Sequence, residues 1–455
     1  MPELRTPVTP LRTTSSSPGQ ANGWKFAWRA LRRRNYRLFF SGQSVSLVGT
    51  WMTRVATSWL VYRLTKSAFL LGLVGFSGQI PFLIFGPLAG VWVDRWNRHR
   101  VLVVTQVLSM LQSFALAVLA LSGRINFWEI FALSLFQGAI NAFDMPGRQA
   151  FLIEMVEARE DLANAVALNS SMVNASRLVG PSLAGIIIAV SGEGYCFLID
   201  GISYIAVIAS LLLMRVSRAP LKARAESVVA ELKEGWEYVA GFVPIRAILL
   251  LTTLISLVGM PYVVLMPIFA GKILHGGPHT LGFLMSASGV GALTSALVLA
   301  RRESVIGLGR IIPLTAGLFG VALMCFSFSR WFWLSFPLMI VTGYGLMQQL
   351  AASNTILQTI VDEDKRGRVM SFYAMAFQGA APFGSLSAGA VASRIGAPVT
   401  LAMGGCLCVL GAVWFSRQLP RVRAVIRPIY RRLGIIPEVA AGVQTATALQ
   451  APPEN

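Results

Sequence analysis

The stretch AFLLGLVGFSGQIPFLIFGPLAGVWVDRWNRHR, residues 68–100, decides the fold of this chain. Residues 68–93 carry no charge, and about 20 apolar residues are enough to cross a hydrocarbon core of roughly 30 Å. The stretch then ends in a charged cluster that begins at Asp94. The pattern predicts a membrane-spanning helix followed by a short charged loop.

The composition extends this pattern to the whole chain. Of 455 residues, 55% are hydrophobic and only 13% are charged. A soluble protein carries about 25% charged residues to wet its surface. The composition therefore excludes a soluble enzyme, a disordered chain and a disulfide-rich secreted domain. It favours an all-α membrane protein with many spans.

Apolar segments separated by short charged connectors predict twelve transmembrane helices. We expect them at about 36–62, 68–93, 101–122, 127–147, 163–190, 195–215, 245–271, 280–300, 311–329, 331–353, 369–393 and 397–418. The resulting domains are a disordered tail and basic interfacial helix (1–35), an N-terminal six-helix bundle (36–215), a cytoplasmic amphipathic linker (216–244), a C-terminal six-helix bundle (245–418) and a basic cytoplasmic tail (419–455).

Lysine and arginine counts on alternate sides predict the orientation. With the amino terminus inside, inner segments hold 31 of the 39 basic residues and outer loops hold 6. The remaining two, Arg54 and Arg177, fall within spans. Because basic residues accumulate on the cytoplasmic side, both termini are expected in the cytoplasm. We expect a multi-pass protein of the plasma membrane, here a bacterial inner membrane.

Similar motifs recur in the two halves at an offset of about 205 residues, as in an internal repeat. The segment Gly180-Pro-Ser-Leu-Ala-Gly185 corresponds to Gly384-Ser-Leu-Ser-Ala-Gly389. An even number of spans in each half makes this a parallel repeat, related by an axis along the membrane normal. The expected architecture is two pseudo-symmetric bundles that rock around a central space.

The loop after the second span carries a family resemblance. Gly90, Asp94, Arg95 and Arg98 resemble the G-x-x-x-D-R-x-G-R-R/K loop of the major facilitator superfamily, although Asn97 replaces its second glycine and His99 a basic residue. The resemblance implies a loop that latches the two halves in the outward-facing state. A carboxylate there can dock on a helix amino terminus. These arginines also fit a simple role in holding the topology.

The fifth span carries a second resemblance. Gly180, Pro181 and Gly185 resemble the G-P-x-x-G-G motif found in antiporters, with Ala184 in place of one glycine. The resemblance implies a hinge, and ordinary packing of small residues is the alternative. In the fourth span, Ser134 occupies the place of a superfamily arginine associated with proton coupling, so that coupling mechanism does not carry over unchanged.

Segments in both halves resemble the exporter branch of the superfamily that includes the enterobactin exporter. They are Asn141–Phe151, Ala163–Ser170, Trp59–Thr65, Asp200–Ser203, Asn354–Gln358 and Arg366–Ser371. The resemblance implies export of a small molecule without naming the cargo.

Charged residues inside spans are the candidates for coupling and substrate binding, because a charge in a bilayer is costly and normally faces a partner or a pathway. They are Arg54, Asp144, Arg148, Arg177 and Asp200. The fold brings spans one, four and five together, so Arg54, Asp144 and Arg177 are expected to share a network, although Asp144 and Arg148 can also pair at i, i+4. Asp200 is placed at the start of the sixth span, near the outer face. Our hypothesis is that Asp144 or Asp200 exchanges a proton while an arginine competes for it.

The second bundle offers polar side chains and few embedded charges, which favours a lipophilic or aromatic cargo, and the resemblance to the exporter branch implies that a siderophore-like cargo is also to be expected. These side chains are Tyr262, Gln348, Gln349, Asn354 and Gln378. We expect no cofactor, no metal site and no nucleic-acid partner. The sequence contains no set of catalytic residues that would indicate an enzyme and no phosphate-binding loop that would indicate an ATP-driven pump. The leading interpretation is a secondary active transporter that exports a small molecule by alternating access and proton-coupled antiport, as a monomer in the lipid bilayer. Uptake of a small solute and a non-transporting scaffold or receptor are the alternatives.

Overall fold

The computed structural model describes residues 28–156, 159–215, 228–302 and 304–435. The first half is built from helices that follow one another with short connections. They are the 3₁₀ helix η1 (Arg29–Arg32), α2 (Arg34–Thr65), α3 (Ala68–Ser77), α4 (Ile80–Arg95), α5 (Arg98–Leu121), α6 (Phe127–Val156), α7 (Arg159–Ser191) and α8 (Glu193–Leu212).

The second half begins after helix α9 (Val228–Gly241), which occupies part of the predicted linker. Its elements are α10 (Val243–Leu254), η2 (Ile255–Gly259), α11 (Tyr262–Ile268), η3 (Phe269–Ile273), α12 (Pro278–Ala300), α13 (Leu308–Phe328), α14 (Phe332–Ile360), α15 (Glu363–Ala374), η4 (Met375–Gly379), α16 (Ala381–Ile395) and α17 (Ala397–Arg432). Here η2, η3 and η4 are π-helical turns.

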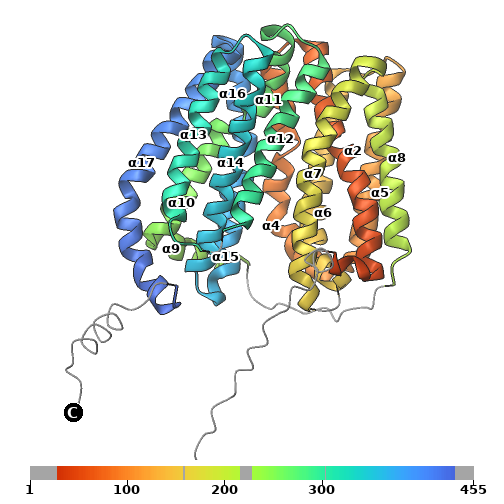
Figure 1. Cartoon of the computed structure of the whole chain (residues 1–455). Coiled ribbons are helices and arrows are strands. Elements are labelled where there is room, and N and C mark those ends of the chain that lie inside the picture. The colour runs from red at the N-terminus through yellow and green to blue at the C-terminus, as the bar shows by residue number, and fades with distance from the viewer. Residues whose placement is uncertain (1–27, 157–158, 216–227, 303, 436–455) are drawn as a thin grey trace, which may run out of the picture.

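The two halves stand side by side, with α7 of the first half next to α12 of the second (Figure 1). The start of α2, helix α9 and the end of α17 all lie at one end of the molecule (Figure 1). We call this the terminal end and the other the distal end. The described helices trace the predicted twelve-span, two-bundle fold.

Apolar side chains cover the outside of the bundles as well as their core. Among the described residues, eight helical segments are long and apolar enough to cross a membrane. Spans one, four, ten and eleven, built on α2, α6, α14 and α15–α16, fall outside this set. Three of these helices carry polar or charged side chains midway, such as Arg54 in α2, Asp144 in α6 and Gln348 in α14.

Three spans are interrupted, and each interruption coincides with proline. The second span divides between α3 and α4, where Pro81 stands in the first turn of α4. The seventh contains two π-helical turns and Pro261, and the eleventh has η4 just before Pro382. Proline lacks the N–H that would continue the hydrogen-bond ladder, which favours a change of pitch or a restart at these three places.

The carboxy-terminal boundary differs from the sequence prediction. The last span was expected to end at residue 418 and a tail to follow, but α17 continues to Arg432. The extension presents Leu419, Val422, Ile426 and Tyr430 at helical spacing, and all four are buried against the second half. This apolar stripe stabilises the added turns, because burial of one helical face outweighs the two prolines within the helix.

The amino-terminal helix also differs from the prediction. Residues 1–27, which include the predicted tail, lie outside the described residues. From Arg29 onward the chain forms η1 and then enters α2. Arg29 and Arg33 both pair with Asp161 near the start of α7, so this basic segment is held against the first bundle by ion pairs.

Helix α9 packs against the second half at the terminal end. A Cβ at Gly235 would lie 2.8 Å from the Phe372 ring, and the Lys365 ammonium lies 4.7 Å from the centre of the Tyr238 ring. The described part of the linker is therefore a structural part of the second half.

Candidate functional site

Two arginines and a tryptophan form a cluster midway along α2 and α7. The guanidinium carbon of Arg54 lies 4.7 Å from the centre of the Trp51 ring, and that of Arg177 lies 5.6 Å from it. Both distances are those of cation–π contacts. Arg54 is exposed although it lies midway along its helix, whereas Trp51 and Arg177 are partly buried. The structure thus brings the two arginines of spans one and five together on one ring.

Asp200 lies inside helix α8, whose start is close to the predicted start of the sixth span. Helix α8 begins at Glu193, so Asp200 lies about two turns inside it and is 1% exposed. Its Oδ2 accepts hydrogen bonds from Thr53 Oγ1 at 2.8 Å and from Ser113 Oγ at 2.9 Å. Its Oδ1 is buried and has no partner in hydrogen-bond geometry among the described residues. Ser203, whose Oγ donates to the Asp200 carbonyl oxygen, also interacts with this carboxylate. Asp200 also interacts electrostatically with Arg54.

Asp144 belongs to a second group of polar residues, which corrects the expected single network. Its Oδ1 accepts hydrogen bonds from Thr105 Oγ1 at 3.0 Å and Gln106 Nε2 at 2.7 Å, and its Oδ2 pairs with Arg148 one turn along α6. The i, i+4 alternative is therefore the arrangement present. Tyr204 interacts electrostatically with this pair and with Asp200. The embedded charges are thus divided between an Arg54–Arg177–Asp200 group and an Asp144–Arg148 group.

The hydrogen-bond donors to these carboxylates were not singled out from the sequence. Helix α5 supplies Thr105, Gln106 and Ser113, and all three are buried. A signal was present, because the polar residues of this apolar helix recur at helical spacing: Thr105, Ser109 and Gln112 at i, i+4 and i+7, with Gln106 and Ser113 beside them. Such a stripe indicates a helix face that meets polar partners.

The charged loop after the second span joins α4 to α5 at the terminal end. The Asn97 side chain caps α5 by accepting a hydrogen bond from the Arg100 N–H at 3.1 Å, which explains why asparagine suits the place of the family glycine. Arg98 forms an ion pair with Glu154 of α6 at 2.7 Å, and Arg95 is exposed. The Asp94 side chain lies outside the described part, as do the surroundings of Gly90.

The three residues of the antiporter-like motif lie at helix contacts of α7. A Cβ at Gly180 would lie 2.5 Å from the Trp51 Cβ, so this glycine allows α2 to approach. A Cβ at Gly185 would lie 2.9 Å from the Pro278 carbonyl oxygen of the other half. Pro181 lies within the continuous helix, and its carbonyl oxygen faces Gly282 of α12. The motif therefore contributes close packing within and between the halves.

Contacts between the halves are concentrated in the distal half of the molecule. Ser182 donates a hydrogen bond to Ser286 at 2.6 Å, and Gln79 donates one to Ser385 at 3.4 Å. At the terminal end, Arg432 pairs with Asp362 within the second half and Arg98 pairs with Glu154 within the first. The described contacts thus join the halves at the end away from the termini.

Most of the polar side chains expected to line a cargo wall in the second half have local partners instead. Tyr262 bonds with Ser288 at 2.9 Å, and Gln348 accepts a hydrogen bond from Ser295 at 2.8 Å. Gln349 donates to Ser353, and Asn354 accepts from Gln358. Gln378 lies in the π-helical turn η4 and is partly buried. Tyr262, Gln348 and Gln349 are at most 2% exposed, so they stabilise packing within the second bundle.

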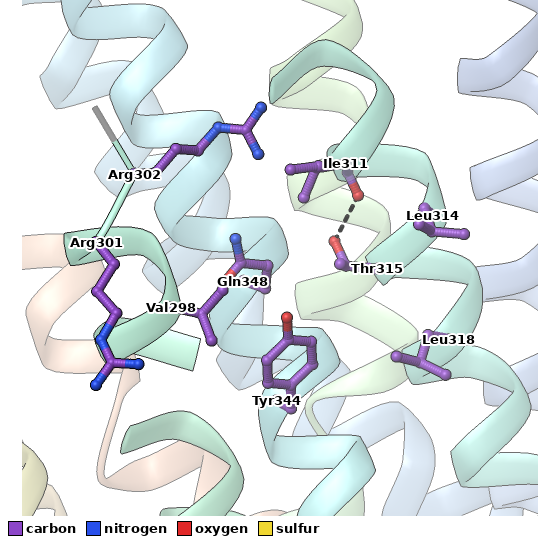
Figure 2. Close-up of a pocket in the computed structure, with 9 residues that line it drawn as sticks. All are labelled: Val298, Arg301, Arg302, Ile311, Leu314, Thr315, Leu318, Tyr344 and Gln348. Carbon is purple, nitrogen blue, oxygen red and sulfur yellow. Dashed lines mark hydrogen bonds between the residues drawn. The ribbon is translucent and has the colours of Figure 1, made fainter. Parts of the chain in front are cut away.

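A lateral pocket of about 330 Å³ lies in the second half, and Figure 2 shows its lining. Helices α12, α13 and α14 and the turn after α12 supply Val298, Arg301, Arg302, Ile311, Leu314, Thr315, Leu318, Tyr344 and Gln348. Leu314 is 71% exposed, which places the pocket on the outer surface of the bundle. The Arg302 guanidinium donates hydrogen bonds to the carbonyl oxygens of Ser304 and Ile306. This pocket shares no residue with the Arg54 or Asp144 group.

The described residues contain no cluster of histidine, cysteine, aspartate or glutamate side chains that could hold a metal ion. The chemistry of the central groups is therefore that of cations, carboxyls and hydroxyls. Such groups can bind an ion or a polar solute and can move a proton.

Comparison with known proteins places this geometry in a family. The family described as transmembrane secretion effectors, within the major facilitator superfamily, matches residues 25–434. The chain is 29% identical over 389 residues to the staphyloferrin A transporter of Staphylococcus aureus, covering 84% of this chain and 96% of that protein. It is 28% identical over 387 residues to the multidrug efflux pump Tap of Mycolicibacterium fortuitum, covering 82% and 93%. It is 23% identical over 400 residues to macrolide efflux protein A of Streptococcus pyogenes, covering 86% and 96%.

Solved transporter structures share the fold. A POT family transporter in complex with a thioalcohol-conjugated peptide superimposes with a TM-score of 0.69 at 11% identity, over 86% of this chain and 96% of that one. A bacterial homologue of the iron transporter ferroportin in an inward-facing state gives 0.66 at 16% identity, over 85% and 98%.

Proposed function

Because the chain belongs to the transmembrane secretion effector family of the major facilitator superfamily, we propose that it is a secondary active transporter that exports a small molecule by alternating access. Relatives named as efflux proteins or as a siderophore transporter, each matched over more than 80% of this chain, support export. The observation that carries the proposal is that the two bundles touch mainly at the distal end, while α2 of the first bundle exposes an arginine midway along its length.

The orientation follows from the charge bias. We place the terminal end in the cytoplasm of a bacterial cell, with the plasma membrane around the bundles, because most basic residues flank that end. The contacts at the distal end then correspond to a state that is closed toward the outside. Gly90, Asp94, Arg95 and Arg98 would latch the terminal end in the opposite state, and Gly180, Pro181 and Gly185 would provide the hinge. Thiol labelling of cysteines introduced at Arg95 and Val190 tests the orientation, since only the second should react from outside the cell.

Proton-coupled antiport is the mechanism that we assign to Asp200. Its Oδ2 holds two hydroxyl donors, and its buried Oδ1 is left without a partner in hydrogen-bond geometry among the described residues. A proton can add at Oδ1 without displacing an existing hydrogen bond. Asp144 is less suited, because Arg148, Thr105 and Gln106 already satisfy both of its oxygens. Movement of Arg54 toward or away from Asp200 would release or admit the proton.

Counterflow in proteoliposomes with an imposed pH gradient tests this coupling. Asp200→Asn should abolish proton-driven transport while it leaves exchange of cargo for cargo intact. Asp144→Asn should lower the amount of folded protein without uncoupling what remains. Intact proton-driven transport in Asp200→Asn would remove Asp200 from the mechanism, and intact transport in both variants would end the carboxylate proposal.

The cargo is expected to be lipophilic or siderophore-like, and the transporter is expected to act as a monomer in the bilayer. Accumulation of the cargo in cells that lack this chain distinguishes the alternatives. Deletion of an exporter raises accumulation of the cargo, deletion of an importer lowers it, and deletion of a scaffold or receptor leaves it unchanged. A screen of efflux-deficient cells against siderophores and unrelated toxic compounds would identify the compound to measure.

A further inference from the structure

The Arg54 and Arg177 guanidiniums share one aromatic ring without a matching pair of carboxylates. Both contact the Trp51 ring, and they interact electrostatically with each other. Asp200 is the carboxylate that interacts with Arg54, but its Oδ2 is bound by Thr53 and Ser113. Among the described residues, neither guanidinium forms an ion pair with a carboxylate. Two like charges at this depth are costly unless an anion joins them.

Arg54 is exposed, and Arg177 lies where α7 meets the second half. Thr50, Thr57 and Ser58 lie on the same face of α2 as Arg54 by helical spacing. A polar face of this kind is directed to the interior of a membrane bundle and away from lipid. Arg177 lies at the junction with the second half, because a Cβ at Gly289 of α12 would lie 3.1 Å from its carbonyl oxygen.

We propose that the exported cargo is an organic anion, whose carboxylate, sulfonate or phosphate group is bound by Arg54 and Arg177. This inference rests on the proposed function and names its substrate class. The planar guanidinium donates two parallel hydrogen bonds to an oxyanion, and charge-assisted hydrogen bonds of this type are about twice as strong as neutral ones. The Trp51 ring adds an apolar surface for the carbon skeleton beside the anionic group.

The electrostatic balance supports an anion over a cation. Arg148 is neutralised by Asp144, so the second group adds no net charge. The Arg54–Arg177–Asp200 group carries one net positive charge when Asp200 is ionised and two when it is protonated. A cation would be repelled in both states, whereas an anion would be attracted in both.

Binding of matched acid and amide probes to the purified full-length protein tests the proposal. The pairs are 1-naphthylacetate with 1-naphthylacetamide, and tricarballylate with its triamide. At least one acid is expected to bind ten times more tightly than its amide. Arg54→Gln and Arg177→Gln should each reduce binding of that acid at least tenfold and leave binding of the amide unchanged. Arg54→Lys, which keeps the charge but loses the fork, should retain part of the preference.

Arg310→Gln is the matched control, because it removes one exposed arginine from the terminal end of the second half, outside the lateral pocket, and should change neither affinity. Equal binding of acid and amide, binding of neither, or an unchanged acid affinity in both glutamine variants would overturn the proposal. The result is separable from the test of export. Acid binding without transport would support the anion site and contradict the export function. Preferential export of neutral compounds would support the export function and contradict the anion site.

Discussion

Gly185 of α7 and Gly282 of α12 face each other across the two halves. A Cβ added at Gly185 would lie 3.1 Å from the Gly282 Cα, and one added at Gly282 would lie 2.9 Å from the Gly185 Cα. The helices can approach this closely because neither residue has a side chain. Backbone contact of this kind closes the distal end, and any opening toward that side must separate these two glycines.

Adding a methyl group at this contact should shift the protein toward distal opening. Gly185→Ala and Gly282→Ala place a Cβ within 3.0 Å of backbone atoms that cannot yield without moving a helix. Spin labels at Val190 and Lys272, in a background where Cys325 and Cys406 are serine, should report a longer distal distance in both variants. Gly317→Ala is the control, since its Cβ would lie 3.6 Å from the nearest atom, Ala412 Cβ. An unchanged distance distribution would show that this contact does not hold the closed state.

The Asp144–Arg148 pair should contribute to stability more than an exposed ion pair does. Asp144→Asn leaves a partly buried arginine without its partner and is expected to cost about 3 kcal/mol of the free energy of unfolding. Arg432→Gln, at a pair whose side chains are 69% and 54% exposed, should cost less than about 1 kcal/mol. Thermal melting in detergent measures both. The double variant Asp144→Asn with Arg148→Gln should cost less than the two single changes combined, and simple additivity would contradict a direct interaction.

The hydrogen bond from Ser256 in η2 to the Phe377 carbonyl oxygen in η4 should stabilise the two π-helical turns together. Ser256→Ala leaves a carbonyl without this donor and is expected to cost about 1–3 kcal/mol. Hydrogen exchange should quicken at the amides of η4. Ser295→Ala removes a comparable bond to Gln348 elsewhere in the second half and should leave exchange in η4 unchanged. Equal exchange rates in wild type and Ser256→Ala would mean that each turn is stable by itself.

The extension of α17 should be part of the folded second half. Truncation after residue 418 removes the buried side chains of Leu419, Val422, Ile426 and Tyr430. Full burial of one large apolar side chain is worth about 1.5–3 kcal/mol, so the melting temperature and the yield of folded protein should fall. Truncation after residue 435 serves as the control and should have no effect. Equal stability of the two truncated proteins would assign the extension to the tail.

The bundle fold could be predicted because its signals are local. Uncharged stretches such as residues 68–93 and the distribution of arginines need no tertiary information. The start of α8 lies close to the predicted start of the sixth span, but the hydrogen bonds of Asp200 with Thr53 and Ser113 depend on how α2, α5 and α8 pack and could not be predicted. The separation of Asp144 from Arg54 depends on how α5 lies between its neighbours. Only the fold reveals that Thr105 and Gln106 meet one carboxylate and Ser113 the other.

The unequal distribution of embedded charge has a consequence for energetics. Arg54, Asp144, Arg148, Arg177 and Asp200 all belong to the first half, whereas charges of the described second half lie near or beyond the ends of its predicted spans. Rocking of the second half against the first therefore carries no fixed mid-membrane charge with it. One elementary charge crossing the membrane is worth about 2.3 kcal/mol per 100 mV. The electrical potential would then act on the transported ions themselves, and the protein would contribute little gating current of its own.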